Sequence, residues 1–237
     1  GMACSSTAAL ELISCRQKLL DSFKSGGDPS AVLTFQANLL ASLHLSLRTR
    51  VDEPHYGHFD EIWDAAGLSD EGDETCRWRR LGFQSESPQY EFEESGLLGL
   101  KALARFATDH RSEFAAVRSS LPSLEVTHSC SQAIKAQLSR PEDRRCPIAT
   151  VSSTITLALA SHFDITSGIS ASPTTPAPFL LRFDEAHYLA TEFFLRIWLE
   201  SGAAVGDFER VATLTRSQIS AALSGRWGEK AWYEVKQ

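Results

Sequence analysis

The sequence lacks an apolar run long enough to cross a membrane. A helix needs about 20 consecutive apolar residues to span the hydrocarbon core of a bilayer. The closest candidate, Ala158 to Ala160 with its flanks, is interrupted by serine, threonine and histidine. The first residues also lack the charged start, apolar middle and cleavage site of a secretory signal. We therefore expect no membrane span and a cytoplasmic location.

Cysteine is scarce and irregularly spaced. The five cysteines, at positions 4, 15, 76, 130 and 146, form no paired pattern. An odd number without such pairs suits a reducing compartment better than a disulfide framework. The tightest cysteine–histidine pair is Cys130 with His128, and residues two apart point to different sides of a helix. A catalytic dyad is therefore not expected there.

Positive charge is limited as well. The chain carries 23 Lys and Arg against 30 Asp and Glu, for a formal net charge of −7. The dense basic stretches, Arg77 to Arg80 and Arg144–Arg145, are short and adjoin acidic residues. Because a protein that follows a phosphate backbone needs clustered cations, nucleic acid is not an expected partner.

Motifs for phosphate, dinucleotide or metal binding are absent too. The sequence has no P-loop, no G-x-S-x-G elbow and no dinucleotide-binding glycine pattern. His55, His58 and Asp60 are possible metal ligands, but no cysteine or further histidine stands nearby to complete a zinc site. The acidic run Asp70 to Glu74 lacks the spacing of a calcium loop. We expect neither a metal nor another cofactor.

What the sequence does have is apolar spacing typical of helices. Its composition, 43% apolar and 22% charged, is that of a globular protein. Apolar residues recur at steps of three and four, so we predict an all-α fold. We expect the first two helices to pack as an N-terminal hairpin. The predicted helices cover residues 8–23, 28–47, a short stretch around 59–63, 74–81, 96–110, 112–119, 127–138, 147–163, 184–201 and 207–223.

Loops and one ambiguity complete this assignment. Residues 51–56, 84–90 and the proline-rich 166–178 are predicted loops. The β-branched run Thr150 to Thr156 favours a strand by composition, whereas its length and Pro147 at its start favour a helix.

The W-x-x-x-G-F pattern at Trp78 has two interpretations. If Gly82 is left-handed just beyond a helix, Trp78 and Phe83 occupy the two positions that touch in a Schellman cap. Alternatively, both rings line a surface for a partner. The adjacent Gln84 either satisfies the loop backbone or contacts a nucleotide or water, as glutamines do in GTPases.

Four segments, taken in order, resemble the ELMO (engulfment and cell motility) domain family. They are FDEIWDAAGL from Phe59, CRWRRLGFQSESPQYEFEESGLLGLKALARF from Cys76, CPIATVSSTITLALASHFDI from Cys146, and HYLATEFFLRIWLESGAAVGDFERV from His187. The family has a leucine–tryptophan helix, a W-x-x-[IL]-G-F-Q-G-x-D-P-x-T-D-F-R-G-x-G-x-L-x-L block, a Y-P-F helix, and a closing tryptophan ahead of D-F. The resemblance implies a single multi-helix ELMO-type domain over 51–225, helices over 1–50 that pack on it, and a tail over 226–237.

The resemblance also implies a role with small GTPases of the Arf and Arf-like group. In the short members the domain activates GTP hydrolysis. In the longer engulfment members it serves a scaffold that binds a DOCK-type exchange factor of Rac. The activating members carry an arginine in the D-F-R-G stretch. The positions that match the block here are Trp78, Gly82, Phe83, Gln84, Pro88, Phe92, Gly96, Leu98 and Leu100, with Glu91 as the acid before the phenylalanine.

At the arginine position itself stands Glu93, followed by Glu94 in place of glycine. An arginine finger places a cation against the charge that develops on the transferring phosphoryl group, an effect of about 10³–10⁵ in rate. A carboxylate there would repel the phosphates. Both glutamates instead suit the start of the next helix, where the dipole favours negative charge.

Nearby arginines are possible substitutes for the finger. Arg105 lies about three helical turns beyond Glu93, and Arg77, Arg79 and Arg80 precede it. We therefore expect an adaptor or degenerate activating protein that binds an Arf or Arf-like GTPase, alone or within a larger protein complex. The alternatives are an active enzyme with a relocated arginine, at Arg105 or Arg80, and a scaffold for a DOCK-type exchange factor or other partner. The expected partner-binding residues are Trp78, Phe83, Gln84, Pro88, Glu91, Glu93 and Glu94.

Overall fold

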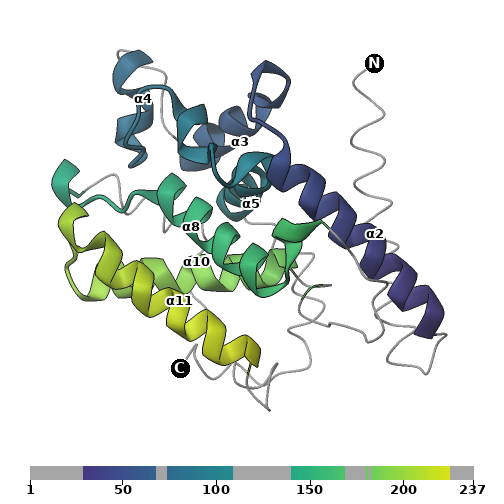
Figure 1. Cartoon of the computed structure of the whole chain (residues 1–237). Helices are drawn as coiled ribbons and strands as arrows, with labels where there is room; N and C mark the ends of the chain where they lie inside the picture. The colour runs from purple at the N-terminus through teal and green to yellow at the C-terminus, as the bar shows by residue number, and fades with distance from the viewer. Residues whose placement is uncertain (1–28, 68–73, 109–139, 169–179, 181–182, 225–237) are drawn as a thin grey trace.

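The structure, a computed structural model, describes residues 29–67, 74–108, 140–168, 180 and 183–224. All regular structure in these ranges is helical, which confirms the all-α prediction (Figure 1). The α-helices are α2 (Pro29–Arg48), α3 (Gly57–Ala66), α4 (Glu74–Arg80), α5 (Gly96–Thr108), α8 (Ile148–His162), α10 (Phe183–Glu200) and α11 (Phe208–Ser224). Short 3-10 turns connect them: η1 (Glu53–His55), η2 (Pro88–Phe92), η3 (Glu142–Arg144), η4 (Ile165–Ser167) and η5 (Val205–Asp207).

Several sequence expectations fall outside these ranges. They are the helices over 8–23, 112–119 and 127–138, most of the loop over 166–178, and the tail over 226–237. The N-terminal hairpin therefore stays a prediction, with α2 as its described half. Among the described helices, none has both the length and the apolar character that crossing a bilayer requires.

Helices α5 and α8 form the centre of the described fold. Helix α5 packs against α2, α3 and α8, and α8 also packs against α10 and α11. Both central helices are buried on most of their circumference, as expected for helices without a solvated face. The β-branched run Thr150 to Thr156 lies within α8, with Val151 and Ile155 buried, so the ambiguity is resolved in favour of a helix.

The C-terminal end of α2 is fixed to the core through backbone contacts. The Leu97 N–H donates to the Thr49 carbonyl at 2.8 Å. Gly96 has φ +57°, and a Cβ there would lie 2.3 Å from the Leu47 carbonyl oxygen. Only glycine permits both this conformation and this approach. His44 Nδ1 also donates to the Ile165 carbonyl at 2.7 Å, which ties α2 to η4.

An aromatic cluster joins α3, α4 and η2. Phe59 and Trp78 have ring centroids 5.3 Å apart, and Phe59 and Phe92 are 6.0 Å apart. Trp63 lies 6.0 Å from Trp78 in an edge-to-face arrangement. Such geometries are favoured by the charge distribution of aromatic rings. The short helices around η2 are thus held in place by ring packing.

A buried polar seam crosses the centre of the fold. The Ser152 hydroxyl donates to the Gly99 carbonyl at 2.9 Å. His187 Nε2 lies 3.2 Å from the Ser152 carbonyl and therefore donates to it. His187 is 1% exposed, and its pKa falls to about 4 because burial penalises the charged form and the Arg105 charge adds to that effect. The Ser152 hydrogen bond opposes this shift.

Candidate functional site

The end of α4 forms the cap that the W-x-x-x-G-F pattern predicts. Gly82 has φ +87°, its N–H donates to the Arg79 carbonyl at 3.0 Å, and the Phe83 N–H donates to the Trp78 carbonyl at 3.2 Å. The Trp78 and Phe83 rings lie 5.2 Å apart. This is the hydrogen-bond pattern of a Schellman motif. A Cβ at Gly82 would lie 2.2 Å from the Cys146 carbonyl oxygen, so α4 ends directly against the start of α8.

The expected partner-binding residues around this cap differ in how exposed their side chains are. Phe83 is buried and Trp78 half-buried, with both rings in the aromatic cluster. Pro88 begins η2, where its fixed φ suits the first helical position. Gln84 is exposed, and its amide Nε2 donates to the Gly82 carbonyl at 3.3 Å. Of these four side chains, only that of Gln84 is exposed.

Glu91 closes the loop that follows Gly82. Its Oε1 accepts hydrogen bonds from the Gln84 N–H at 2.6 Å and the Ser85 N–H at 2.9 Å. Its Oε2 accepts from the Thr150 hydroxyl at 2.9 Å. Because each bond involves a charged acceptor, the three are stronger than neutral hydrogen bonds. The carboxylate thereby ties the loop to α8.

Glu93 and Glu94 lie on the surface between η2 and α5. Both side chains are exposed, and Glu93 takes part in the backbone turn that ends η2 by donating its N–H to the Tyr90 carbonyl at 3.3 Å. Neither carboxylate has an ion pair within the described part of the chain. Two unneutralised negative charges therefore occupy the place where the family resemblance puts an arginine and a glycine.

Three of the four arginines considered as substitutes have partners. Arg105 forms an ion pair with Asp184 of α10. The Arg77 guanidinium lies over the Trp63 ring, 4.3 Å from its centroid. Arg79 Nη2 lies 3.7 Å from Glu86 Oε1. For Arg80 the described residues provide neither a hydrogen bond nor an ion pair, so it is the least constrained of the four.

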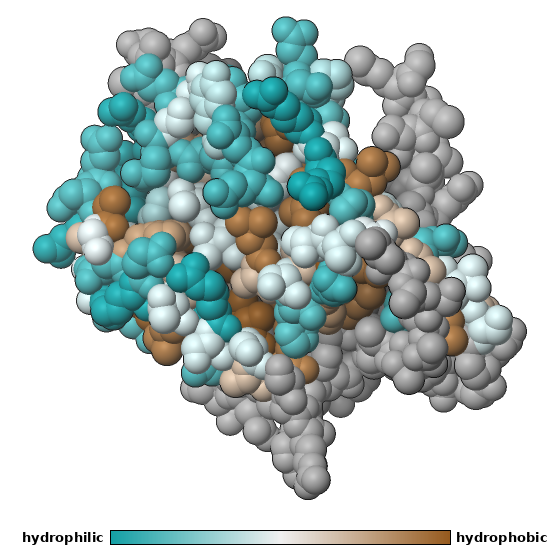
Figure 2. Space-filling view, viewed as in Figure 1, coloured by the Kyte–Doolittle hydropathy of each residue, from teal (hydrophilic) through white to brown (hydrophobic). Residues whose placement is uncertain are grey.

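A pocket of about 610 Å³ opens beside the Gly82 turn. Hydrophilic residues cover most of the side of the molecule on which α4 lies, as Figure 2 shows. The pocket brings together the two basic stretches of the sequence, since Arg79 and Arg145 both line it. Its lining residues are Arg79, Gly82, Phe83, Gln84, Glu142, Asp143, Arg145 and Val205. Glu93, Glu94, Arg80 and Arg105 do not line it.

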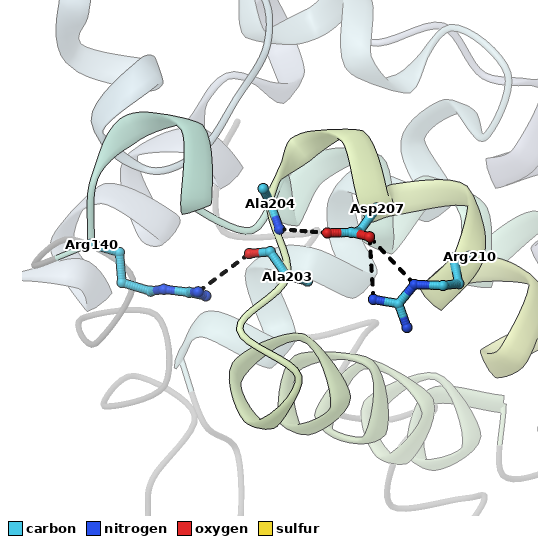
Figure 3. A network of polar contacts seen from close by, with 5 residues as sticks. All are labelled: Arg140, Ala203, Ala204, Asp207 and Arg210. Atoms are coloured by element: carbon cyan, nitrogen blue, oxygen red, sulfur yellow. Dashed lines mark hydrogen bonds and ion pairs between the residues drawn. The ribbon is translucent and has the colours of Figure 1, made fainter.

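The η3 wall of this pocket is held by hydrogen bonds to the end of α10. The Trp198 indole Nε1 donates to the Arg144 carbonyl at 3.1 Å. Arg140 Nη2 donates to the Ala203 carbonyl at 3.3 Å (Figure 3). Arg145 Nε in turn donates to the Arg140 carbonyl at 3.1 Å. The sequence pointed to this segment only through the Arg144–Arg145 stretch, because its partners lie more than 50 residues away.

Asp207 fixes the η5 wall, which carries Val205. Its Oδ2 accepts from the Ala204 N–H at 3.1 Å, and its Oδ1 accepts from Arg210 Nη2 at 3.3 Å (Figure 3). The Ala204 hydrogen bond lowers the pKa of the Asp207 carboxyl, and the Arg210 hydrogen bond lowers it further. Just before η5, Gly202 ends α10 with φ +62°.

The charged groups that line the pocket are the Glu142 and Asp143 carboxylates and the Arg79 and Arg145 guanidinium groups. The pocket lining contains no histidine, cysteine, serine or lysine among the described residues. Cys146 is buried, and desolvation raises the pKa of its thiol well above the usual value, which disfavours the reactive thiolate. His55 and His58, considered as metal ligands, face the neighbouring carboxylates Asp52 and Glu61 at 2.7 and 2.9 Å.

Comparison with known proteins identifies a family to which the chain is similar. The sequence model of the ELMO/CED-12 family matches residues 38–212, more than half of the 237-residue chain. No curated protein and no solved structure matches the chain. The matched range begins within α2, ends within α11 and includes the four segments described above. The chain therefore belongs to the ELMO/CED-12 family.

Proposed function

We propose that this ELMO/CED-12 family protein binds a small GTPase of the Arf or Arf-like group in the cytoplasm, as an adaptor or degenerate activating protein. It engages the GTPase without accelerating GTP hydrolysis. The observation that carries the proposal is Glu93, exposed at the position where the resemblance places the arginine of the activating members. A carboxylate there cannot neutralise the negative charge that grows on a transferring phosphoryl group.

The adjacent charge supports the same interpretation. Glu94 is exposed beside Glu93, and neither has a neutralising cation in the described ranges. Two carboxylates near a nucleotide would raise the local negative potential and oppose close approach of the phosphates. The surface is compatible with a protein partner whose contacts lie away from its nucleotide.

The surroundings of the substitute arginines also support it. Moving Arg105 to a nucleotide would break its ion pair with Asp184, and moving Arg77 would remove its stacking on Trp63. Each change leaves a partly buried group without its partner, which costs free energy. Arg80 has no such bond to break among the described residues, so it is the residue that a catalytic test has to include.

The experiment is single-turnover GTP hydrolysis by a panel of Arf and Arf-like GTPases, with binding measured in parallel for the GDP-bound and GTP-bound forms. We expect binding to at least one member with an unchanged hydrolysis rate. An acceleration of roughly a thousandfold that Arg80→Ala or Arg105→Ala abolishes would favour an active enzyme with a relocated arginine. Equal binding of the GDP-bound and GTP-bound forms would favour a scaffold, for example for a DOCK-type exchange factor.

A further inference from the structure

The charged side chains in the pocket beside Gly82 are not paired with one another. Glu142 and Asp143 are exposed, and within the described part of the chain neither forms an ion pair. Arg145 likewise has no carboxylate partner there. The Arg79 ion pair is with Glu86, at 3.7 Å, and both of these side chains are about half exposed. Such exposed pairs contribute little, so the pocket offers charges of both signs to a ligand.

Arg145 is oriented before any ligand arrives. Its Nε donates to the Arg140 carbonyl at 3.1 Å, which uses one edge of the guanidinium and leaves both Nη atoms without a partner among the described residues. The backbone beneath it is held by the Trp198 bond to the Arg144 carbonyl. A guanidinium fixed in this way loses less conformational freedom on binding and can hold a carboxylate through two parallel hydrogen bonds.

The charge balance of the lining selects among anionic ligands. A site for phosphate or nucleic acid would gather cations and exclude acids. Here Glu142 and Asp143 stand beside Arg79 and Arg145, so the four formal charges cancel and a purely anionic ligand meets repulsion as well as attraction. A protein segment with an acidic and a basic side chain can satisfy both signs at once. Val205, 37% exposed, adds an apolar contact at the edge.

We propose that this pocket is the docking site for a mixed-charge segment of a protein partner. Arg145 receives a carboxylate of that segment, while Glu142 and Asp143 receive its basic side chain. The inference deepens the proposed function and rests on it only for the identity of the partner as a small GTPase.

Binding of defined peptides tests the pocket directly. Three labelled peptides of equal length, one alternating Glu and Lys, one with Glu only and one with Lys only, are titrated against the full chain, with inorganic phosphate as competitor. The alternating peptide is expected to bind tightest. Arg145→Ala is expected to weaken that binding about tenfold, the effect of losing a hydrogen-bonded ion pair. Equal or tighter binding of the all-Glu peptide, or displacement by phosphate, overturns the proposal.

Two further variants separate docking from general charge. Arg145→Lys keeps the charge, but its single ammonium nitrogen cannot bond to the Arg140 carbonyl and also hold a carboxylate through two parallel hydrogen bonds. We therefore expect it to weaken peptide binding nearly as much as Arg145→Ala does. Arg216→Ala is the matched control, because Arg216 pairs with Glu209 on α11 and does not line the pocket. Circular dichroism verifies that each variant is folded. Unchanged binding by Arg145→Ala, or an equal loss with Arg216→Ala, also overturns the proposal.

The GTPase panel distinguishes this proposal from the proposed function. If a GTPase binds the wild type and Arg145→Ala equally well, the pocket is not its docking site, although the proposed function stands. If no GTPase binds but the alternating peptide binds in an Arg145-dependent way, the proposed function fails and the docking site stands with another partner. Loss of GTPase binding in both Arg145→Ala and the double variant Glu142→Lys, Asp143→Lys supports both.

Discussion

Glu91 and Glu93 stand two residues apart and have opposite surroundings. The Glu91 carboxylate accepts three hydrogen bonds from Gln84, Ser85 and Thr150, whereas Glu93 is exposed and unpaired within the described residues. The Glu91 carboxylate therefore holds the loop geometry, whereas Glu93 makes no comparable side-chain contact among the described residues. This contrast separates a residue that holds the fold from a residue free to determine function.

We expect Glu91→Ala to lower the free energy of unfolding by about 1–3 kcal/mol, because the loop N–H groups and the Thr150 hydroxyl lose their acceptor. The matched variant Glu93→Ala should change it by less than about 0.5 kcal/mol, as surface substitutions usually do. Urea unfolding followed by circular dichroism measures both. If both variants change the free energy of unfolding equally, the hydrogen bonds of Glu91 make no net contribution to stability.

Restoring the cation at position 93 tests the electrostatic argument. We expect the double variant Glu93→Arg, Glu94→Gly to accelerate GTP hydrolysis by a bound Arf or Arf-like GTPase, by up to about 10³-fold. The variant Glu53→Arg, at an exposed glutamate of η1, controls for a new surface arginine in place of a glutamate away from position 93. Single-turnover hydrolysis is the measurement. A variant that binds the GTPase but leaves the rate unchanged would mean that other catalytic features are missing as well.

At the scale of single residues, sequence reasoning succeeds where the geometry is local. The contact between Trp78 and Phe83 was predictable because a Schellman cap involves only neighbouring positions around one glycine. The Glu91 bond to Thr150 spans 59 residues, and Gln84 and Arg145, which line the same pocket, have a similar separation in the sequence. No local pattern encodes such contacts. The sequence therefore showed that Glu91 matches the family block but not that it bonds to the loop and to α8.

Three glycines differ in what their positions require: Gly82 follows α4, Gly202 follows α10 and Gly206 lies within η5. Gly82 has a left-handed backbone and also lies against the Cys146 carbonyl. Gly202 is left-handed, but a Cβ at this position would meet no described atom within 4 Å, and Gly206 has neither constraint. These positions allow backbone strain to be separated from close packing.

For alanine at these three glycines we expect a graded loss of stability. Gly206→Ala should change the free energy of unfolding by less than about 0.5 kcal/mol, and Gly202→Ala should lower it by about 1–2 kcal/mol through the left-handed backbone alone. Gly82→Ala should lower it by about 3 kcal/mol or more, because strain and the clash with Cys146 combine. Thermal and urea unfolding measure the series. If Gly82→Ala lowers the free energy of unfolding no more than Gly202→Ala does, the result would argue against the close approach of α4 and α8.

At the scale of elements, the sequence predicted the long α-helices well and the short 3-10 turns poorly. The predicted range 147–163 matches α8 (Ile148–His162), and 184–201 matches α10 (Phe183–Glu200). The predicted loop over 84–90 instead contains the start of η2 (Pro88–Phe92), a turn held by Glu91 and by packing of Phe92. Short 3-10 turns carry too few residues to show a periodic pattern, so η1 and the start of η2 fall in predicted loops.

At the scale of the whole described fold, contacts link the four family-like segments to one another or to the residues beside them. Trp63 of the first contacts Trp78 of the second, and Cys146 of the third lies against Gly82. Trp198 of the fourth holds the Arg144 carbonyl beside the pocket. The order of the segments was visible in the sequence, but their meeting around Arg79 and Arg145 depends on how α4, α8 and α10 pack.

The centre of the molecule carries a group whose charge state depends on pH. His187 of α10 is buried against Ser152 of α8, near the ion pair of Arg105 and Asp184. Its pKa of about 4 in the folded state is below the value of about 6.5 in an unfolded chain. Between these values the unfolded chain binds the proton more readily, so stability is lost as the pH falls from 6.5 to 4.

We expect this group to lower the free energy of unfolding by about 3 kcal/mol over that interval. His187→Gln, which keeps an N–H donor for the Ser152 carbonyl but does not titrate, should show a correspondingly flatter pH dependence. Urea unfolding at a series of pH values measures the difference between the two proteins. The pKa of Asp207 is lowered from its ordinary value of 3.8. The stability that Asp207 contributes is therefore lost at a pH below the interval from 6.5 to 4 and does not account for a change within it. Parallel pH profiles for wild type and His187→Gln would mean that His187 is protonated or solvated in the native state, against its buried position beside Ser152 and Thr191.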